Sequence, residues 1–135
     1  MERQAVPADS PYAPTVGYSR AVRVGPHVYV AGTAAIMPGG APPPAGAYDQ
    51  ARRCLEIVVA ALAEVGARPE DVVRTRVYVT AAEHWEEAGR AHGEVFGEIL
   101  PASAMIVVTG FLDERFLVEI EADAFVAGDG EYSAK

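Results

Sequence analysis

Hydrophobic and polar residues alternate along the chain with two different periods, which separate predicted strands from predicted helices. The clearest alternation, with a period of two, lies in residues 116–126, where Leu117, Glu119, Glu121 and Asp123 share one face and apolar residues share the other. A period of two is typical of a strand with one buried face. Shorter runs rich in β-branched and aromatic residues predict further strands at 18–24, 28–31, 72–80 and 104–109.

A period of three to four residues predicts two helices. Apolar residues recur at this spacing through 47–65, and Gly66 stands where a helix C-cap is expected. A second apolar stripe runs through 82–96, from Trp85 to Phe96. Each helix is therefore expected to bury one face against the strands.

The order of these elements is two strands, a helix, a strand, a helix and two strands, which predicts a single α+β domain over residues 1–135. We expect two layers, a mixed sheet with both helices on one face. The polar, proline-broken residues 1–15 predict a loose N-terminal arm, and residues 127–135 a C-terminal tail. The other sheet face is half polar and half apolar, which is typical of a surface that packs against another subunit. We therefore expect an oligomer, with any ligand site at the seam between subunits.

The acidic composition narrows the possible partners. With 19 acidic and 11 basic residues the formal net charge is −8, which argues against a nucleic-acid surface and against docking on anionic lipid. No apolar run approaches the ~20 residues of a membrane span, and residues 1–14 lack a signal-peptide core, so we expect a cytoplasmic protein with no membrane partner. The single cysteine, Cys54, is expected to be a buried, inert thiol, and no cysteine–histidine cluster has the spacing of a metal site.

Four segments of the chain resemble the Rid family, also called the YjgF/YER057c/UK114 family. They are GYSRAVRVGPHVYVAGT (17–33), VVRTRVYVT (72–80), PASAMIVV (101–108) and LVEIEADAFV (117–126). They occur in the family's order, and the match they belong to extends over nearly the whole chain. The resemblance implies a chorismate-mutase-like α+β fold, a homotrimer and clefts between its subunits. The best-known members hydrolyse reactive enamines and imines to 2-oxo acids and ammonia, without a metal or a cofactor.

The resemblance also implies a set of cleft residues. The aromatic residue that opens the family's first strand matches Tyr18, and its Ser-Gly step matches Ala31-Gly32. The carboxylate that orients the attacking water matches Glu119. The arginine that binds the substrate carboxylate is replaced here by Ser103, which can donate one hydrogen bond but carries no charge. The resemblance therefore implies a divergent member that lacks two of the expected side chains, the arginine and the serine.

Arg20 is the candidate to replace the missing cation. It lies two residues after Tyr18, so the two side chains leave the same face of the strand. The alternatives are a solvated arginine at a sheet edge and a partner for Glu121 across the sheet. Thr33 and Ser103 each add a hydroxyl that can bind a ligand.

Three functions remain open on these observations. The first is a hydrolase of enamines, imines or related carbonyl compounds, in which Glu119 is the general base. The second is a binding protein that senses or sequesters a small metabolite without turnover. The third, an endoribonuclease, is disfavoured by the net charge of −8. His92 is expected to be a packed, hydrogen-bonded residue of the second helix, not a catalytic group.

Overall fold

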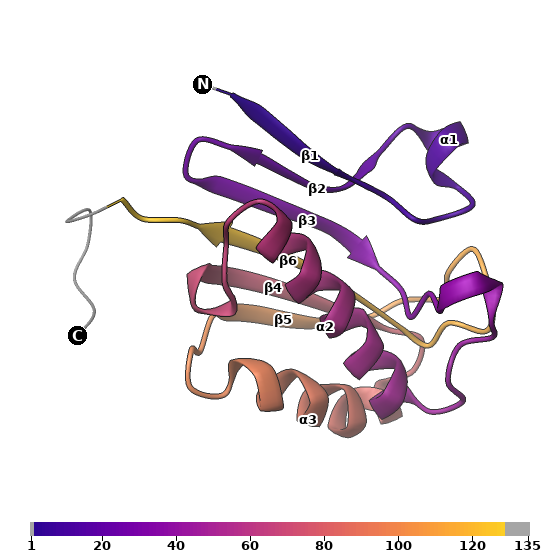
Figure 1. Ribbon diagram of the computed structural model, residues 1–135. Helices are drawn as coiled ribbons and strands as arrows, with labels where there is room; N and C mark the ends of the chain where they lie inside the picture. Colours follow the sequence, from indigo (N-terminus) through magenta and orange to yellow (C-terminus); the bar gives the residue numbers. More distant parts are fainter. Residues whose placement is uncertain (1, 129–135) are drawn as a thin grey trace.

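The period-two segments of the sequence form strands of one six-stranded sheet, as the computed structural model of residues 2–128 shows (Figure 1). The strands are β1 (Arg3–Pro7), β2 (Ser19–Val24), β3 (His27–Thr33), β4 (Val72–Val79), β5 (Ala102–Val107) and β6 (Val118–Phe125). Their order across the sheet is β1-β2-β3-β6-β4-β5. The β4–β5 pair is parallel and the four other pairs in the described part of the chain are antiparallel, so the sheet is mixed.

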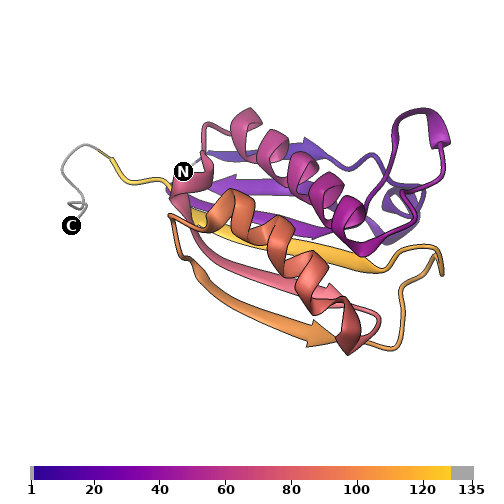
Figure 2. The same ribbon diagram turned by 90° about the horizontal axis from the view of Figure 1, so that it is seen from below.

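The two predicted helices lie side by side on one face of this sheet (Figure 2). They are α2 (Ala47–Glu64) and α3 (Trp85–Phe96), and a single turn of helix, α1 (Ala13–Val16), precedes β2. Short 3-10 helices occur at Pro38–Gly40, Pro69–Asp71 and Ala82–His84. The α+β prediction with both helices on one face is therefore confirmed. No helix within residues 2–128 is both long enough and apolar enough to span a bilayer.

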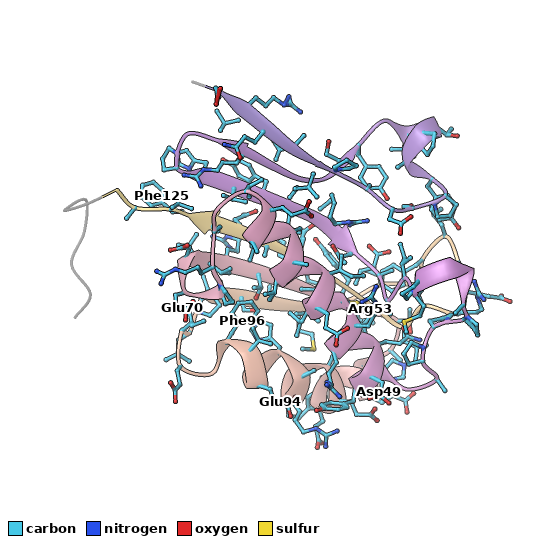
Figure 3. All side chains as sticks on the ribbon, viewed as in Figure 1. Asp49, Arg53, Glu70, Glu94, Phe96 and Phe125 are labelled. Atoms are coloured by element: carbon cyan, nitrogen blue, oxygen red, sulfur yellow. The ribbon has the colours of Figure 1, made fainter. Side chains whose placement is uncertain are left out.

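The core lies between the helices and the sheet. In β6, Val118, Ile120 and the two alanines that follow at the same period are buried, whereas the alternate residues are half-buried. Phe96 points between α3 and the sheet, and Glu94 points outward (Figure 3). Trp85, the first residue of α3, is 60% exposed, so the apolar stripe of this helix reaches the core only beyond its first turn.

The described part of the N-terminal segment contains a strand and a turn of helix, so the prediction of a loose arm over residues 1–15 is wrong there. Residues 3–7 form β1, which pairs with β2 from Arg3 opposite Val24 to Pro7 opposite Ser19. Four of its five residues are exposed, which leaves no period-two pattern in the sequence for so short an edge strand. The predicted C-terminal tail at 127–135 falls largely outside the described residues.

Two irregularities in strand pairing determine where the candidate site lies. In β2, Arg20 has no partner on β1, because Val6 pairs with Ala21 while Pro7 pairs with Ser19. In β3, the register shifts between Val30 and Thr33. Such bulges bend a strand and change the direction of its side chains. Both lie at the same end of the sheet, beside the start of β6.

Candidate functional site

A cavity of about 540 Å³ opens at this end of the sheet. Its walls come from the segment before β2, the end of β3, the loop that follows β3 and the loop before β6. Five of the seven site residues predicted from the sequence line it, namely Tyr18, Arg20, Ala31, Gly32 and Glu119. Segments far apart in the sequence thus converge on one cavity of the size that small-molecule sites usually have.

Glu119 is the half-buried carboxylate of this cavity. Burial raises its pKa above the ordinary value, the nearby Arg20 guanidinium opposes that shift, and the Glu121 carboxylate adds to it. A β-carbon placed on Gly32 would lie 2.9 Å from Glu119 Oε1, so the carboxylate occupies space that exists only beside a glycine. A carboxylate with a raised pKa, held against a cavity wall, is suited to accept a proton from water.

Arg20 is buried and bonded to the bulge of β3. The residue is only 5% exposed. Its Nη1 atom donates one hydrogen bond to Gly32 O at 2.8 Å and another to Thr33 Oγ1 at 3.0 Å. Thr33 Oγ1 in turn donates to Ala31 O at 2.7 Å. The guanidinium also lies 5.7 Å from the centre of the Tyr18 ring, within cation–π range. Arg20 therefore reaches the cavity, but one of its two terminal nitrogens already binds the protein.

The two alternative expectations for Arg20 are wrong. A solvated arginine would not be buried, and Glu121 has other partners on the open face of the sheet. Arg76 Nη1 lies 3.2 Å from a Glu121 carboxylate oxygen, and Tyr78 donates to the same oxygen at 2.8 Å. Arg76 also pairs with Asp123 at 3.5 Å.

Ser103 lies away from the cavity of its own chain. It sits on β5, where Thr75 Oγ1 donates to Ser103 Oγ at 2.8 Å. Thr75 Oγ1 also lies 2.7 Å from His92 Nε2, and burial lowers the pKa of His92. The His92 ring packs 4.8 Å from that of Phe96, as expected of a hydrogen-bonded, packed histidine. Ser103 can approach Glu119 only if a second subunit brings it there.

Gln50 organises the cavity, and the sequence analysis did not identify it. This buried residue of α2 donates through Nε2 to Pro44 O at 2.8 Å and to Arg115 O at 3.0 Å, and its Oε1 accepts from Leu117 N at 2.8 Å. It thereby ties together two loops that frame the cavity. The sequence feature that points to Gln50 is an amide side chain among the apolar residues of a helix, one turn before Cys54.

The rim of the cavity carries an ion pair. Arg115 Nη2 lies 2.7 Å from Asp113 Oδ2, and Arg115 Nε donates to Asp113 Oδ1 at 3.0 Å. These hydrogen bonds lower the pKa of Asp113 to about 2. The rim guanidinium is thus neutralised by its own loop. Within residues 2–128, no group of three or more histidine, cysteine, aspartate or glutamate side chains is placed to hold a metal ion.

A family model and several known proteins match the sequence of this chain along most of its length. Residues 8–126 match the family model described as Endoribonuclease L-PSP. An uncharacterised protein of Streptomyces coelicolor is 37% identical over 120 residues, which are 89% of this chain and 90% of that protein. A RutC family protein of Pyrococcus abyssi is 31% identical over 126 residues, 93% of this chain and 98% of that protein.

Solved structures give the same result. Rv2704 of Mycobacterium tuberculosis, a member of the YjgF/YER057c/UK114 family, superposes with a TM-score of 0.84 at 43% identity, covering 93% of this chain and 100% of that one. E. coli TdcF with bound serine superposes with a TM-score of 0.77 at 26% identity, covering 91% and 94%.

Proposed function

The chain belongs to the YjgF/YER057c/UK114 (Rid) family, and from that premise we propose that it hydrolyses reactive enamines or imines with Glu119 as the general base. The observation that carries the proposal is the half-buried carboxylate with a raised pKa on the wall of a cavity. The structure of TdcF with bound serine adds that a relative accommodates a small organic molecule.

The proposed reaction needs only water. Glu119 takes a proton from the water as its oxygen bonds to the imine carbon, and the electron pair of the C=N π bond moves to nitrogen. Glu119 returns this proton to the nitrogen, the hydroxyl proton then passes to the amino group as the C–N bond breaks, and a carbonyl product and ammonia leave. An enamine substrate first takes up a proton at carbon and loses one from nitrogen, which converts it to the imine. General-base assistance of this kind contributes typically ~10²–10⁴-fold to a rate.

Arg20, Gly32 and Tyr18 have supporting roles in this proposal. The Arg20 guanidinium holds the β3 bulge, and its charge limits the rise in the pKa of Glu119. Gly32 leaves room for the carboxylate, and the Tyr18 ring offers a planar surface to a planar substrate. The backbone at Ala31 lines the same wall.

We further propose a homotrimer in which β5 completes a neighbouring cavity. All six residues of β5 are exposed, among them Met105 at 39%, Ile106 at 36% and Val107 at 55%. An edge strand with this much apolar surface is normally covered. Ser103 of the partner subunit would then face a cavity that contains Glu119. Light scattering of the purified protein tests the assembly, and a monomer at micromolar concentration would contradict it.

The hydrolase proposal is tested by trapping imines. An amino-acid oxidase generates 2-imino acids and an amine oxidase generates imines without a carboxylate, each in the presence of semicarbazide, and the protein should speed the loss of at least one of the two classes of imine. Glu119→Gln should reduce that acceleration at least ~100-fold. Glu121→Gln, two residues along the same strand face, is the matched control and should retain activity within about threefold.

The two other functions give different results in the same experiments. A binding protein would show saturable ligand binding and no imine turnover in either the parent or the variant. An endoribonuclease, the activity in the name of the matching family model, would cleave RNA in a salt-sensitive manner. The net charge of −8 argues against the latter.

A further inference from the structure

The walls of the Glu119 cavity are mostly apolar. Aromatic and aliphatic side chains from three separate segments face it, including Tyr12, Val16, Ile36, Met37, Phe111 and Phe116. At about 540 Å³ the cavity falls within the ~300–1,000 Å³ typical of small-molecule sites. Leu112 and Val16 are 79% and 66% exposed, so apolar surface continues to the mouth. These walls favour a substrate with a bulky apolar or aromatic group.

The charges in the cavity are already compensated. Among the described residues that line it, two are arginines and two are carboxylates, so their formal charges cancel: Arg115 is paired with Asp113, and Arg20 lies near Glu119 without an ion pair to it. Arg115 is held by Asp113 at 2.7 Å, and Nη1 of Arg20 is held by Gly32 O and Thr33 Oγ1. A substrate carboxylate would add a second negative charge beside Glu119, and the one guanidinium there, Arg20, is already bonded to β3 through Nη1. Burying a charge without a partner is strongly unfavourable.

A second subunit would not supply the missing positive charge through Ser103. The Ser103 hydroxyl already accepts a hydrogen bond from Thr75 at 2.8 Å and has only one proton of its own to donate. Behind Thr75 lies His92, and burial lowers the pKa of that imidazole, which keeps it neutral near pH 7. Ser103, Thr75 and His92 therefore offer a ligand one neutral hydrogen bond. A guanidinium at the position of Ser103 would instead bind a carboxylate through two hydrogen bonds.

We infer that this cavity selects imines, or the corresponding carbonyl compounds, that carry a bulky apolar or aromatic group and no carboxylate. The inference rests on the proposed function for the chemistry, but the selectivity is a property of binding. The reaction is R–CH=NH + H₂O giving R–CHO and NH₃, with Glu119 accepting the proton of the attacking water. Imines of this class form when a primary amine is oxidised, so an amine-oxidising reaction must supply the substrate.

The test of selectivity uses a pair of unreactive ligands that differ only in charge. Phenylacetamide and phenylacetate have nearly the same shape, and calorimetry on the intact protein compares their affinities at pH 7.5. We expect the amide to bind at least about tenfold more tightly. Tighter or equal binding of phenylacetate would overturn the inference, and so would the absence of binding by both.

Two variants of Ser103 sharpen this test. Ser103→Arg returns a guanidinium to the position and should raise phenylacetate affinity at least about tenfold. Ser103→Ala is the matched control and should leave the preference for the amide unchanged. Circular dichroism confirms that each variant is folded. If Ser103→Arg is folded and has no effect on phenylacetate, the role assigned to Ser103 is wrong.

A turnover experiment separates the inference from the proposed function. Oxidation of phenylethylamine and of phenylalanine yields imines with the same benzyl group, without and with a carboxylate, and semicarbazide traps both. Faster hydrolysis of the carboxylate-free imine supports both proposals, and preference for the 2-imino acid overturns the inference while the hydrolase proposal stands. No turnover of either imine, with the amide still bound preferentially, overturns the hydrolase proposal and leaves the selectivity in place.

Discussion

Glu119 and Glu121 lie two residues apart on β6 with their side chains on the same face of the sheet, yet their surroundings differ. Glu121 accepts hydrogen bonds from Arg76 at 3.2 Å and Tyr78 at 2.8 Å. Glu119 lies beside the buried Arg20, whose Nη1 bonds instead to a backbone carbonyl and a hydroxyl on β3. One carboxylate is paired in the sheet surface, and the other remains available in a cavity.

Strand register explains the difference. On β4, Arg76 stands directly opposite Glu121, whereas Tyr78 stands opposite Glu119. A cross-strand neighbour of opposite charge forms an ion pair with little rearrangement. On the other side of β6, the register of β3 shifts between Val30 and Thr33, and Gly32 lies against Glu119. The different surroundings of the two carboxylates thus arise from pairing geometry on both sides of one strand.

After removal of the Glu119 carboxylate itself, the largest loss of activity is expected from filling the space beside it. Gly32→Ala places a methyl group 2.9 Å from Glu119 Oε1 and should displace the carboxylate. Misplacing a catalytic group by about 1 Å can cost ~100-fold, so we expect imine hydrolysis to fall about 10–100-fold. Gly93→Ala is the control, because a methyl group there meets open space inside α3. Equal activity in the two variants would contradict the role of Gly32.

Removing the Arg20 guanidinium should have the next largest effect. Arg20→Gln loses the hydrogen bonds to Gly32 O and Thr33 Oγ1, which should lower the free energy of unfolding by about 2–3 kcal/mol. Arg20 also lowers the pKa of Glu119, so the rise of activity with pH should move to higher pH. Urea denaturation and a pH–rate profile measure the two effects. Arg52→Gln, an exposed arginine of α2, should change stability by less than about 0.5 kcal/mol.

Glu119→Gln should change how stability depends on pH. Burial raises the pKa of Glu119 from 4.5, so the folded state holds its proton more tightly than the unfolded state does. The stabilisation that Glu119 provides is present in full at a pH below its ordinary pKa. It is lost as the pH rises through the raised pKa of the folded state. Glutamine stays neutral, so the variant should gain melting temperature relative to the parent between pH 4 and pH 8. A difference that does not vary with pH would show that Glu119 is not destabilised by burial.

The smallest effect is expected from changing Arg76, the arginine that pairs with Glu121. Arg76→Met breaks the ion pairs with Glu121 and Asp123, whose side chains are about one third exposed, and should cost less than about 1 kcal/mol. Because the unpaired Glu121 then acts more strongly on its neighbour, the pKa of Glu119 should rise slightly further. Arg76→Lys keeps the charge and should leave the pH–rate profile unchanged. A large loss of activity in Arg76→Met alone would show that the paired cluster is part of the site.

Local patterns in the sequence determined the main strands and helices of this protein and its fold class. The period of two in residues 116–126 predicted a strand and put Glu119 on the face away from the core, as observed in β6. The period of three to four predicted α2, and the order of elements predicted the α+β class with helices on one face. These features depend on residues close together in the chain, because burying one face of a helix or strand requires a regular spacing.

Tertiary structure alone decided the rest of the site. Whether Arg20 bonds to β3 or to a carboxylate depends on bulges between strands that pair at a distance, and no local pattern encodes them. The strand at residues 3–7 is fixed by pairing with β2, and Gln50 acquires its role only when two remote loops fold over it. Periodicity reports which face of an element is buried, whereas partners and pKa shifts depend on which distant residues the fold brings within a few ångströms.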